Sequence, residues 1–175
     1  MIAAWLADKG RLALALVAAV AFQTVVTSQL PILGVTADLF LLLTVLVAIS
    51  RGATVGLVFG FVAGLTADIV FLDPVGLRTF IYLIVGYGVG WYVEEFGLPS
   101  AWMVVVLAGV TSLLSQGVYG IFQFIMGSAG GFMAMTRLQV LPAALVDGLL
   151  AAPLYVGLVR LRILPRPDAA DPSFR

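Results

Sequence analysis

The residues of this chain that could do chemistry are carboxylates. The 175-residue sequence contains neither cysteine nor histidine, which removes thiol nucleophiles, imidazole bases and Cys/His metal sites. Three aspartates, Asp38, Asp68 and Asp147, lie within or beside apolar stretches. Two carboxylates held close together can share a proton, as in an aspartic dyad. Whether that chemistry is possible depends on the helices that carry them.

The composition indicates a polytopic membrane protein. Hydrophobic residues make up 62% of the chain and charged residues only 10%, and a soluble domain of this size could not bury so much apolar surface. The net charge of zero gives no indication of a nucleic-acid partner. The sequence has no phosphate-binding loop, which excludes ATP hydrolysis. An all-α membrane helical bundle in contact with lipid is the expected fold.

Six apolar segments are predicted to be transmembrane helices, because most of them reach the roughly 20 residues that a helix needs to cross the bilayer core. We expect the first to be a retained span rather than a cleaved signal peptide. Together they predict one six-helix transmembrane domain over residues 1–164, followed by a disordered cytoplasmic tail over 165–175. The predicted helices cover residues 12–30, 36–50, 52–71, 77–93, 101–126 and 139–161.

The distribution of lysine and arginine predicts that both termini are cytoplasmic. With the N-terminus inside, only Arg78 and Arg137 lie outside, which agrees with the excess of basic residues in cytoplasmic loops. The seven basic residues on the cytoplasmic side are then Lys9, Arg11, Arg51, Arg160, Arg162, Arg166 and Arg175.

A row of glycines at every fourth position marks the third predicted helix. Lipid supplies no hydrophobic force between helices, so glycines favour association by allowing two backbones to approach closely. We expect this row to pack inside the bundle, with Gly86 and Gly90 of the next helix as a facing surface, and a homodimer seam is the alternative. The row consists of Gly52, Gly56, Gly60 and Gly64, and the next step of four is Asp68.

A charged cluster is predicted at the outer end of the second and third helices. Asp38 lies 13 residues before Arg51 and Asp68 lies 17 after it, which places the carboxylates roughly 20 and 26 Å from the inner turn. Asp73 and Arg78 follow in the next loop and helix. We expect a structural ion pair between Arg78 and either Asp38 or Asp68, and a polar outward-facing pocket is the alternative.

Asp147 is predicted near the middle of the membrane, ten residues after Arg137 and thirteen before Arg160. A charge there is costly, so the side chain should face the bundle interior or be protonated. Gln116 and Gln123 are its candidate partners. A proton or ligand site and a hydrogen bond that holds helices together are both open interpretations.

Two stretches resemble the MreD family, the rod-shape-determining membrane proteins of bacteria. They are "ADLFLLLTVLVAISRGATVGLVFGFVAGLTADIV" at residues 37–70 and "DPVGLRTFIYLIVGYGVGW" at residues 73–91. The family's last helix often carries asparagine where this chain has Asp147. The resemblance implies a multi-pass, non-enzymatic scaffold of the bacterial cytoplasmic (inner) membrane, without a cofactor. It also implies binding to MreC, a bitopic protein, and indirect association with MreB filaments, RodA and a penicillin-binding transpeptidase in peptidoglycan synthesis.

Two other functions are weighed against this one. The MreD fold is similar to that of the substrate-binding subunits of energy-coupling-factor vitamin transporters, so such a subunit is the main alternative. An intramembrane aspartyl protease is disfavoured because "GLTAD" at residues 64–68 lacks the Gly-x-Gly-Asp of those enzymes. For the scaffold function, the candidate partner surfaces are the outer charged cluster and a glycine-lined helix face.

Overall fold

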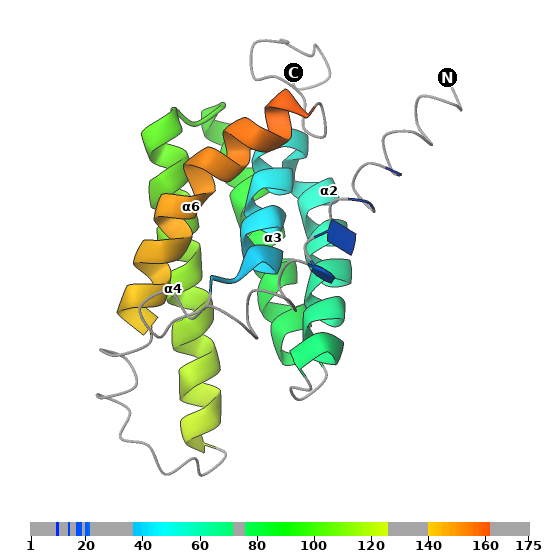
Figure 1. Cartoon of the computed structure of the whole chain (residues 1–175), viewed down its shortest axis with the longest axis vertical. Coiled ribbons are helices and arrows are strands. Elements are labelled where there is room, and N and C mark those ends of the chain that lie inside the picture. Colours follow the sequence, from blue (N-terminus) through cyan, green and yellow to red (C-terminus); the bar gives the residue numbers. More distant parts are fainter. Residues whose placement is uncertain are drawn as a thin grey trace.

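The computed structural model describes residues 37–71, 76–125 and 140–161, together with a few positions between residues 10 and 21. The described parts form four main helices: α2 (Leu39–Phe71), α3 (Leu77–Phe96), α4 (Ala101–Ile125) and α6 (Leu141–Arg160) (Figure 1). Among the described residues, three stretches are long and apolar enough to cross a membrane, namely α2, Trp102–Phe122 within α4, and α6. The prediction of a helical membrane protein is thereby confirmed. Most of the predicted first helix and the tail after residue 164 lie outside the described residues, so the count of six spans stays a prediction.

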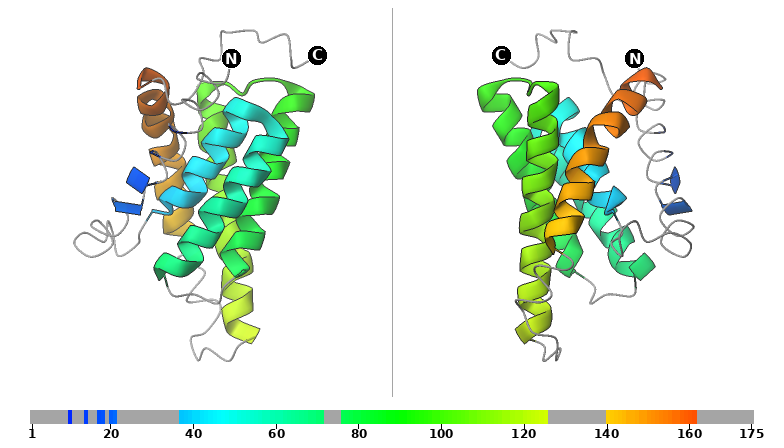
Figure 2. Two further views of the ribbon diagram at one scale, coloured as in Figure 1. Left: turned by 90° about the vertical axis from the view of Figure 1, so that its right-hand side faces the viewer. Right: turned by 60° about the vertical axis from the view of Figure 1, so that its left-hand side comes forward.

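Helix α2 is a hairpin of two limbs, residues 39–51 and residues 53–71. The limbs meet at Gly52, whose φ of 81° and ψ of −175° are not helical and suit a residue without a Cβ. The limbs run antiparallel and in contact, because a Cβ placed on Gly60 would meet the side chain of Thr44 (Figure 2). The separately predicted helices 36–50 and 52–71 thus correspond to one element that reverses direction at a single residue.

The first limb of α2 forms the centre of the bundle. No residue from 40 to 49 is more than 4% exposed, so this limb is apolar and enclosed on every side, as a core helix is. Its 13 residues extend only about 20 Å, whereas the hydrocarbon core of a bilayer is about 30 Å thick. Helix α2 therefore begins within the bundle, and the N–H groups of its first turn need hydrogen-bond acceptors there.

The helices pack as two pairs, α2 with α3 and α4 with α6, and contacts within each pair are much denser than contacts between pairs. In the α2–α3 pair the backbones touch along the glycine row. A Cβ added to any of three glycines of the second limb would lie under 3.0 Å from the α3 backbone. The facing residues are Gly56 against Gly86, Gly60 against Tyr82, and Gly64 against Arg78 and Thr79.

The α4–α6 pair also uses glycine. A Cβ on Gly148 would lie 3.2 Å from the carbonyl oxygen of Val105 and 3.5 Å from the Cα of Gly109. We call the end of the bundle with the α2 hairpin turn the Gly52 end, and the opposite end, where α3 begins, the Gly76 end. Towards the Gly52 end the two pairs share one apolar core, to which α4 and α6 contribute Val104, Ala108, Ala151 and Leu158.

Candidate functional site

Asp68 is fully buried and caps a helix other than its own. Helix α3 begins after Gly76, which has no side chain to cap the first turn. The Asp68 carboxylate accepts hydrogen bonds from the backbone N–H groups of Gly76 (2.8 Å), Arg78 (3.1 Å) and Thr79 (3.2 Å), and from the Thr79 hydroxyl (2.7 Å). The first N–H groups of a helix lack intrahelical partners and carry partial positive charge. Asp68 therefore joins the second limb of α2 to the start of α3.

Asp38 caps its own helix and also pairs with α3. One carboxylate oxygen accepts the N–H of Leu41 at 3.1 Å, which is the usual bond of an N-cap residue to the third residue of its helix. The other oxygen accepts the hydroxyl of Tyr82, which is fully buried, and lies 3.2 Å from Nη1 of Arg78. The ion pair that the sequence left open between two aspartates is thus formed with Asp38.

Arg78 connects this cluster to α4. Its guanidinium carbon lies 4.8 Å from the ring centroids of both Phe71 and Tyr119. A guanidinium over an aromatic face gains a cation–π attraction that increases as water is excluded. The side chains of Arg78 and Asp38 are 21% and 12% exposed, so this end of the cluster is the part that remains reachable.

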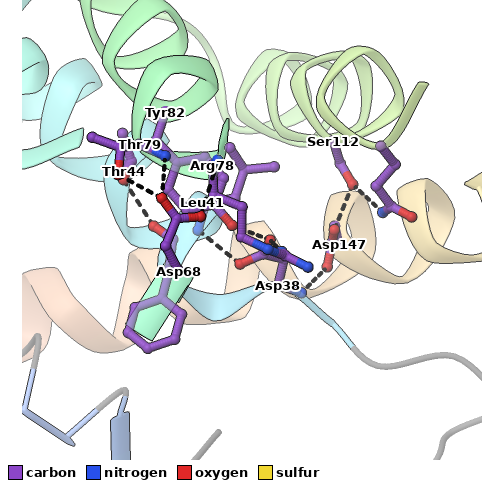
Figure 3. Close-up of polar contacts among 11 residues, drawn as sticks. Asp38, Leu41, Thr44, Asp68, Arg78, Thr79, Tyr82, Ser112 and Asp147 are labelled. Carbon is purple, nitrogen blue, oxygen red and sulfur yellow. Dashed lines mark hydrogen bonds and ion pairs between the residues drawn. The ribbon is translucent and has the colours of Figure 1, made fainter. Parts of the chain in front are cut away.

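Asp147 links α6 to its partner helix α4 and also to the start of α2 in the other pair. One carboxylate oxygen accepts the backbone N–H of Asp38 at 3.0 Å, and the other accepts the hydroxyl of Ser112 on α4 (Figure 3). The Ser112 oxygen in turn accepts a hydrogen bond from Gln116 at 3.0 Å. Gln116 is therefore one step removed from Asp147, and the side chain of Gln123 lies outside the described residues.

The bond from the Asp38 N–H to Asp147 completes a capping box whose second member comes from another helix. In the usual capping box the third helical residue accepts the N–H of the N-cap residue, but here that residue is Leu41 and cannot do so. Asp147 supplies the missing acceptor from α6, although it is fully buried and 109 positions away in the sequence.

A third cap between helices lies at the Gly52 end. Glu94 of α3 accepts the backbone N–H of Ala53 at 2.7 Å, and Ala53 is the first residue of the second limb of α2. Three helical segments thus begin against a carboxylate from a different element. The carboxylates that accept these hydrogen bonds between helices belong to Asp68, Glu94 and Asp147.

Sequence reasoning missed several members of the cluster. Tyr82, Thr79 and Ser112 are fully or nearly fully buried, and each occupies a position that an apolar core residue could fill equally well. One signal was available, because α3 begins after a glycine and so requires a polar cap from elsewhere. Two further residues were named from the sequence. Asp73 lies outside the described residues, whereas Gly90 is described and faces the backbone of Gly52 and Ala53.

Comparison with known families decides the identity of the chain. A family model described as rod shape-determining protein MreD matches residues 10–162. The chain belongs to the MreD family. That membership makes it a membrane protein of the rod-shape-determining machinery in which MreC also acts, and it confirms the resemblance carried by residues 37–70 and 73–91. No curated protein and no solved structure matches the chain, so the expected likeness of MreD to the vitamin-binding subunits stays a prediction.

Proposed function

We propose that this MreD protein is a non-enzymatic scaffold of the bacterial cell-elongation machinery. It spans the cytoplasmic membrane six times with both termini inside and binds an MreC-like bitopic protein. Through that partner it acts with MreB filaments, RodA and a penicillin-binding transpeptidase in the control of peptidoglycan synthesis. The family match supports the role in cell shape, and the excess of basic residues predicted inside supports the orientation.

The observation that carries the scaffold proposal is the way the aspartates are used. Asp38, Asp68 and Asp147 each accept hydrogen bonds that hold helix starts in place. The Ser112 hydroxyl occupies the second oxygen of Asp147. A proton-sharing dyad would instead require two carboxylates bonded to one another. The arrangement therefore favours a structural task for these charges.

The Gly76 end is the candidate surface for the partner. The glycine row of the second limb already packs against α3, so that face is occupied within one chain and does not support the homodimer seam. Arg78 and Asp38 keep partial exposure at the Gly76 end. On the proposed orientation this end faces the periplasm, where the part of MreC next to its membrane helix would lie.

Affinity purification from the native membrane tests the proposal. The tagged chain is solubilised in mild detergent, and co-purifying proteins are quantified by mass spectrometry. We expect near-stoichiometric recovery of a bitopic MreC-like protein, together with restored rod shape when the chain is expressed in cells depleted of their own MreD. Recovery of an ATPase module with its coupling membrane subunit, and no MreC-like protein, would overturn the scaffold in favour of vitamin transport.

A further inference from the structure

With one exception, the hydrogen bonds made by the Asp38 and Asp147 side chains divide into two sets, and each set lies within one helix pair. In the α2–α3 pair, the Asp38 carboxylate is bonded to Leu41, Arg78 and Tyr82. In the α4–α6 pair, Asp147 is bonded to Ser112. The hydrogen bond that joins these sets runs from the Asp38 N–H to the Asp147 carboxylate, and beside it Arg78 of α3 contacts the ring of Tyr119 on α4. Breaking it leaves both carboxylates with partners in their own pair.

The apolar contact between the pairs lies at a different level from this bond. Val104 and Ala108 of α4 and Leu158 of α6 belong to the core shared with the first limb. Counted from the ends of their helices at the Gly52 end, these three lie within about 11 Å of that end and Ala151 about 14 Å from it, whereas Ser112 and Asp147 lie about 17 to 20 Å from it. The pairs are thus held by side-chain packing near one end and by polar contacts further along.

We propose that the Asp38–Asp147 bond is a latch that holds the two helix pairs together towards the Gly76 end, and that opening it lets them separate there while they pivot on the apolar core near the Gly52 end. Each pair stays rigid, because its own backbones are in glycine-mediated contact. Packed interfaces of this kind shift between discrete arrangements rather than deform continuously. The latch is a property of this chain alone and does not depend on which partner binds or on how the bundle is oriented.

The latch requires a hydrogen-bond acceptor at position 147. In Asp147→Asn the amide oxygen can accept the Asp38 N–H and the amide nitrogen can donate to Ser112. The Ser112 hydroxyl can then donate to the carbonyl four residues earlier, as Thr111 already does to Leu107 at 2.7 Å. Asp147→Ala removes the acceptor and leaves the Asp38 N–H without it. Asn and Ala at this position are therefore a matched pair.

Distances between spin labels test the latch, and the chain suits them because it has no native cysteine. One label pair, Ile69→Cys with Val118→Cys, spans α2 and α4 towards the Gly76 end. A second pair, Val58→Cys with Val106→Cys, spans the same two helices towards the Gly52 end. A third pair within the α2–α3 pair, Ile69→Cys with Phe80→Cys, reports whether that pair stays intact. All five of these positions are exposed in the single chain.

In lipid nanodiscs we expect Asp147→Ala to raise the ratio of long to short distances for the Ile69–Val118 labels by roughly fivefold to a hundredfold, because the Asp38 N–H loses its acceptor. The other two label pairs should keep their distances, and Asp147→Asn should match the parent chain. An unchanged Ile69–Val118 distance, equal widening of the Val58–Val106 pair, or identical behaviour of the two variants would each overturn the latch.

A second variant keeps the test available if Asp147→Ala does not insert. Asp147→Val also removes the acceptor for the Asp38 N–H, and its larger apolar side chain fills more of the space that alanine leaves empty. We expect the Ile69–Val118 labels to widen in this variant too, with the Val58–Val106 labels unchanged. Distances that match the parent chain at both ends would contradict the latch.

Discussion

Asp68 and Glu94 cap each other's helices from opposite ends of the α2–α3 pair. Asp68, near the end of the second limb, accepts the first N–H groups of α3, and Glu94, near the end of α3, accepts the first N–H of that limb. Each cap is satisfied only when the two helices lie in one register. A shift of one turn would remove both carboxylates from their donors, so the two caps fix the register that the glycine contacts alone leave less defined.

The Asp68 cap predicts a large loss of stability when its acceptor is removed. Asp68→Ala leaves three N–H groups at the start of α3, one buried and two partly buried, without that acceptor, and we expect a loss of about 2–4 kcal/mol in the free energy of unfolding. Asp68→Asn keeps one acceptor oxygen and should lose less, with the bundle still inserted. Unfolding in mixed detergent micelles, followed by circular dichroism, measures both. A loss below about 0.5 kcal/mol for Asp68→Ala would contradict the capping role.

Replacing Gly60 by a residue with a side chain should cause a severe packing defect. Any Cβ there would collide with the backbone carbonyl of Tyr82, which cannot move aside as a flexible side chain could. We expect Gly60→Leu to abolish folding or assembly, since overpacking costs 1–3 kcal/mol or more even in tolerant cores. Gly117→Leu on α4 is the matched control, because nothing described lies within 4 Å of its added Cβ. Membrane yield, monodispersity and rescue of rod shape are the readouts, and an inserted, fully complementing Gly60→Leu protein would refute the packing interpretation.

Gly52→Ala should lower the stability of the protein in two separable ways, by backbone strain and by loss of a helix cap. Gly52 and Gly97 both have positive φ, of 81° and 84°, so alanine at either should cost roughly 1–2 kcal/mol in strain. Only at Gly52 would the new Cβ also collide with the Glu94 carboxylate. We therefore expect Gly52→Ala to be the more destabilising, by about 1 kcal/mol for the displaced cap. Equal midpoints of thermal unfolding for the two variants would show that Glu94 contributes nothing there.

Arginine and lysine at position 78 should differ in how much they stabilise the protein. Arg78→Lys keeps the charge near Asp38 but loses the planar group between the rings of Phe71 and Tyr119. We expect a loss of about 1 kcal/mol for lysine and about 2–3 kcal/mol for Arg78→Ala, since the ion pair is only partly exposed. Thermal unfolding in detergent measures both. If lysine and alanine proved equally harmful, the charge would be irrelevant and the stacking alone would matter.

The helices and the glycine face could be predicted from the sequence because they depend on local patterns. Apolar length identifies a membrane helix, and a four-residue period places Gly56, Gly60 and Gly64 along one contact line whatever the partner helix is. The level of Asp38 and Arg78 also followed from counting residues along helices of fixed rise. These inferences use only distances along the chain.

The bonds within the cluster could not be predicted in the same way. Asp68 accepts backbone N–H groups rather than the guanidinium, and that choice depends on the exact turn by which α3 begins. Asp147 and Asp38 meet although they are 109 residues apart, and only the packing of α6 on the bundle brings them together. The hydroxyls of Tyr82 and Ser112 become partners for the same reason, since nothing in their local sequence distinguishes them from ordinary helix residues.

The enclosed first limb of α2 separates the polar cluster from changes in the surrounding lipid. A membrane helix in contact with acyl chains tilts or bends when the bilayer becomes thicker or thinner, but no residue from 40 to 49 is more than 4% exposed. The outer helices therefore adapt to acyl-chain length, while the short central limb keeps Asp38 at a constant height above the Gly52 turn. The same internal arrangement can then persist in membranes whose thickness changes with growth temperature or fatty-acid supply.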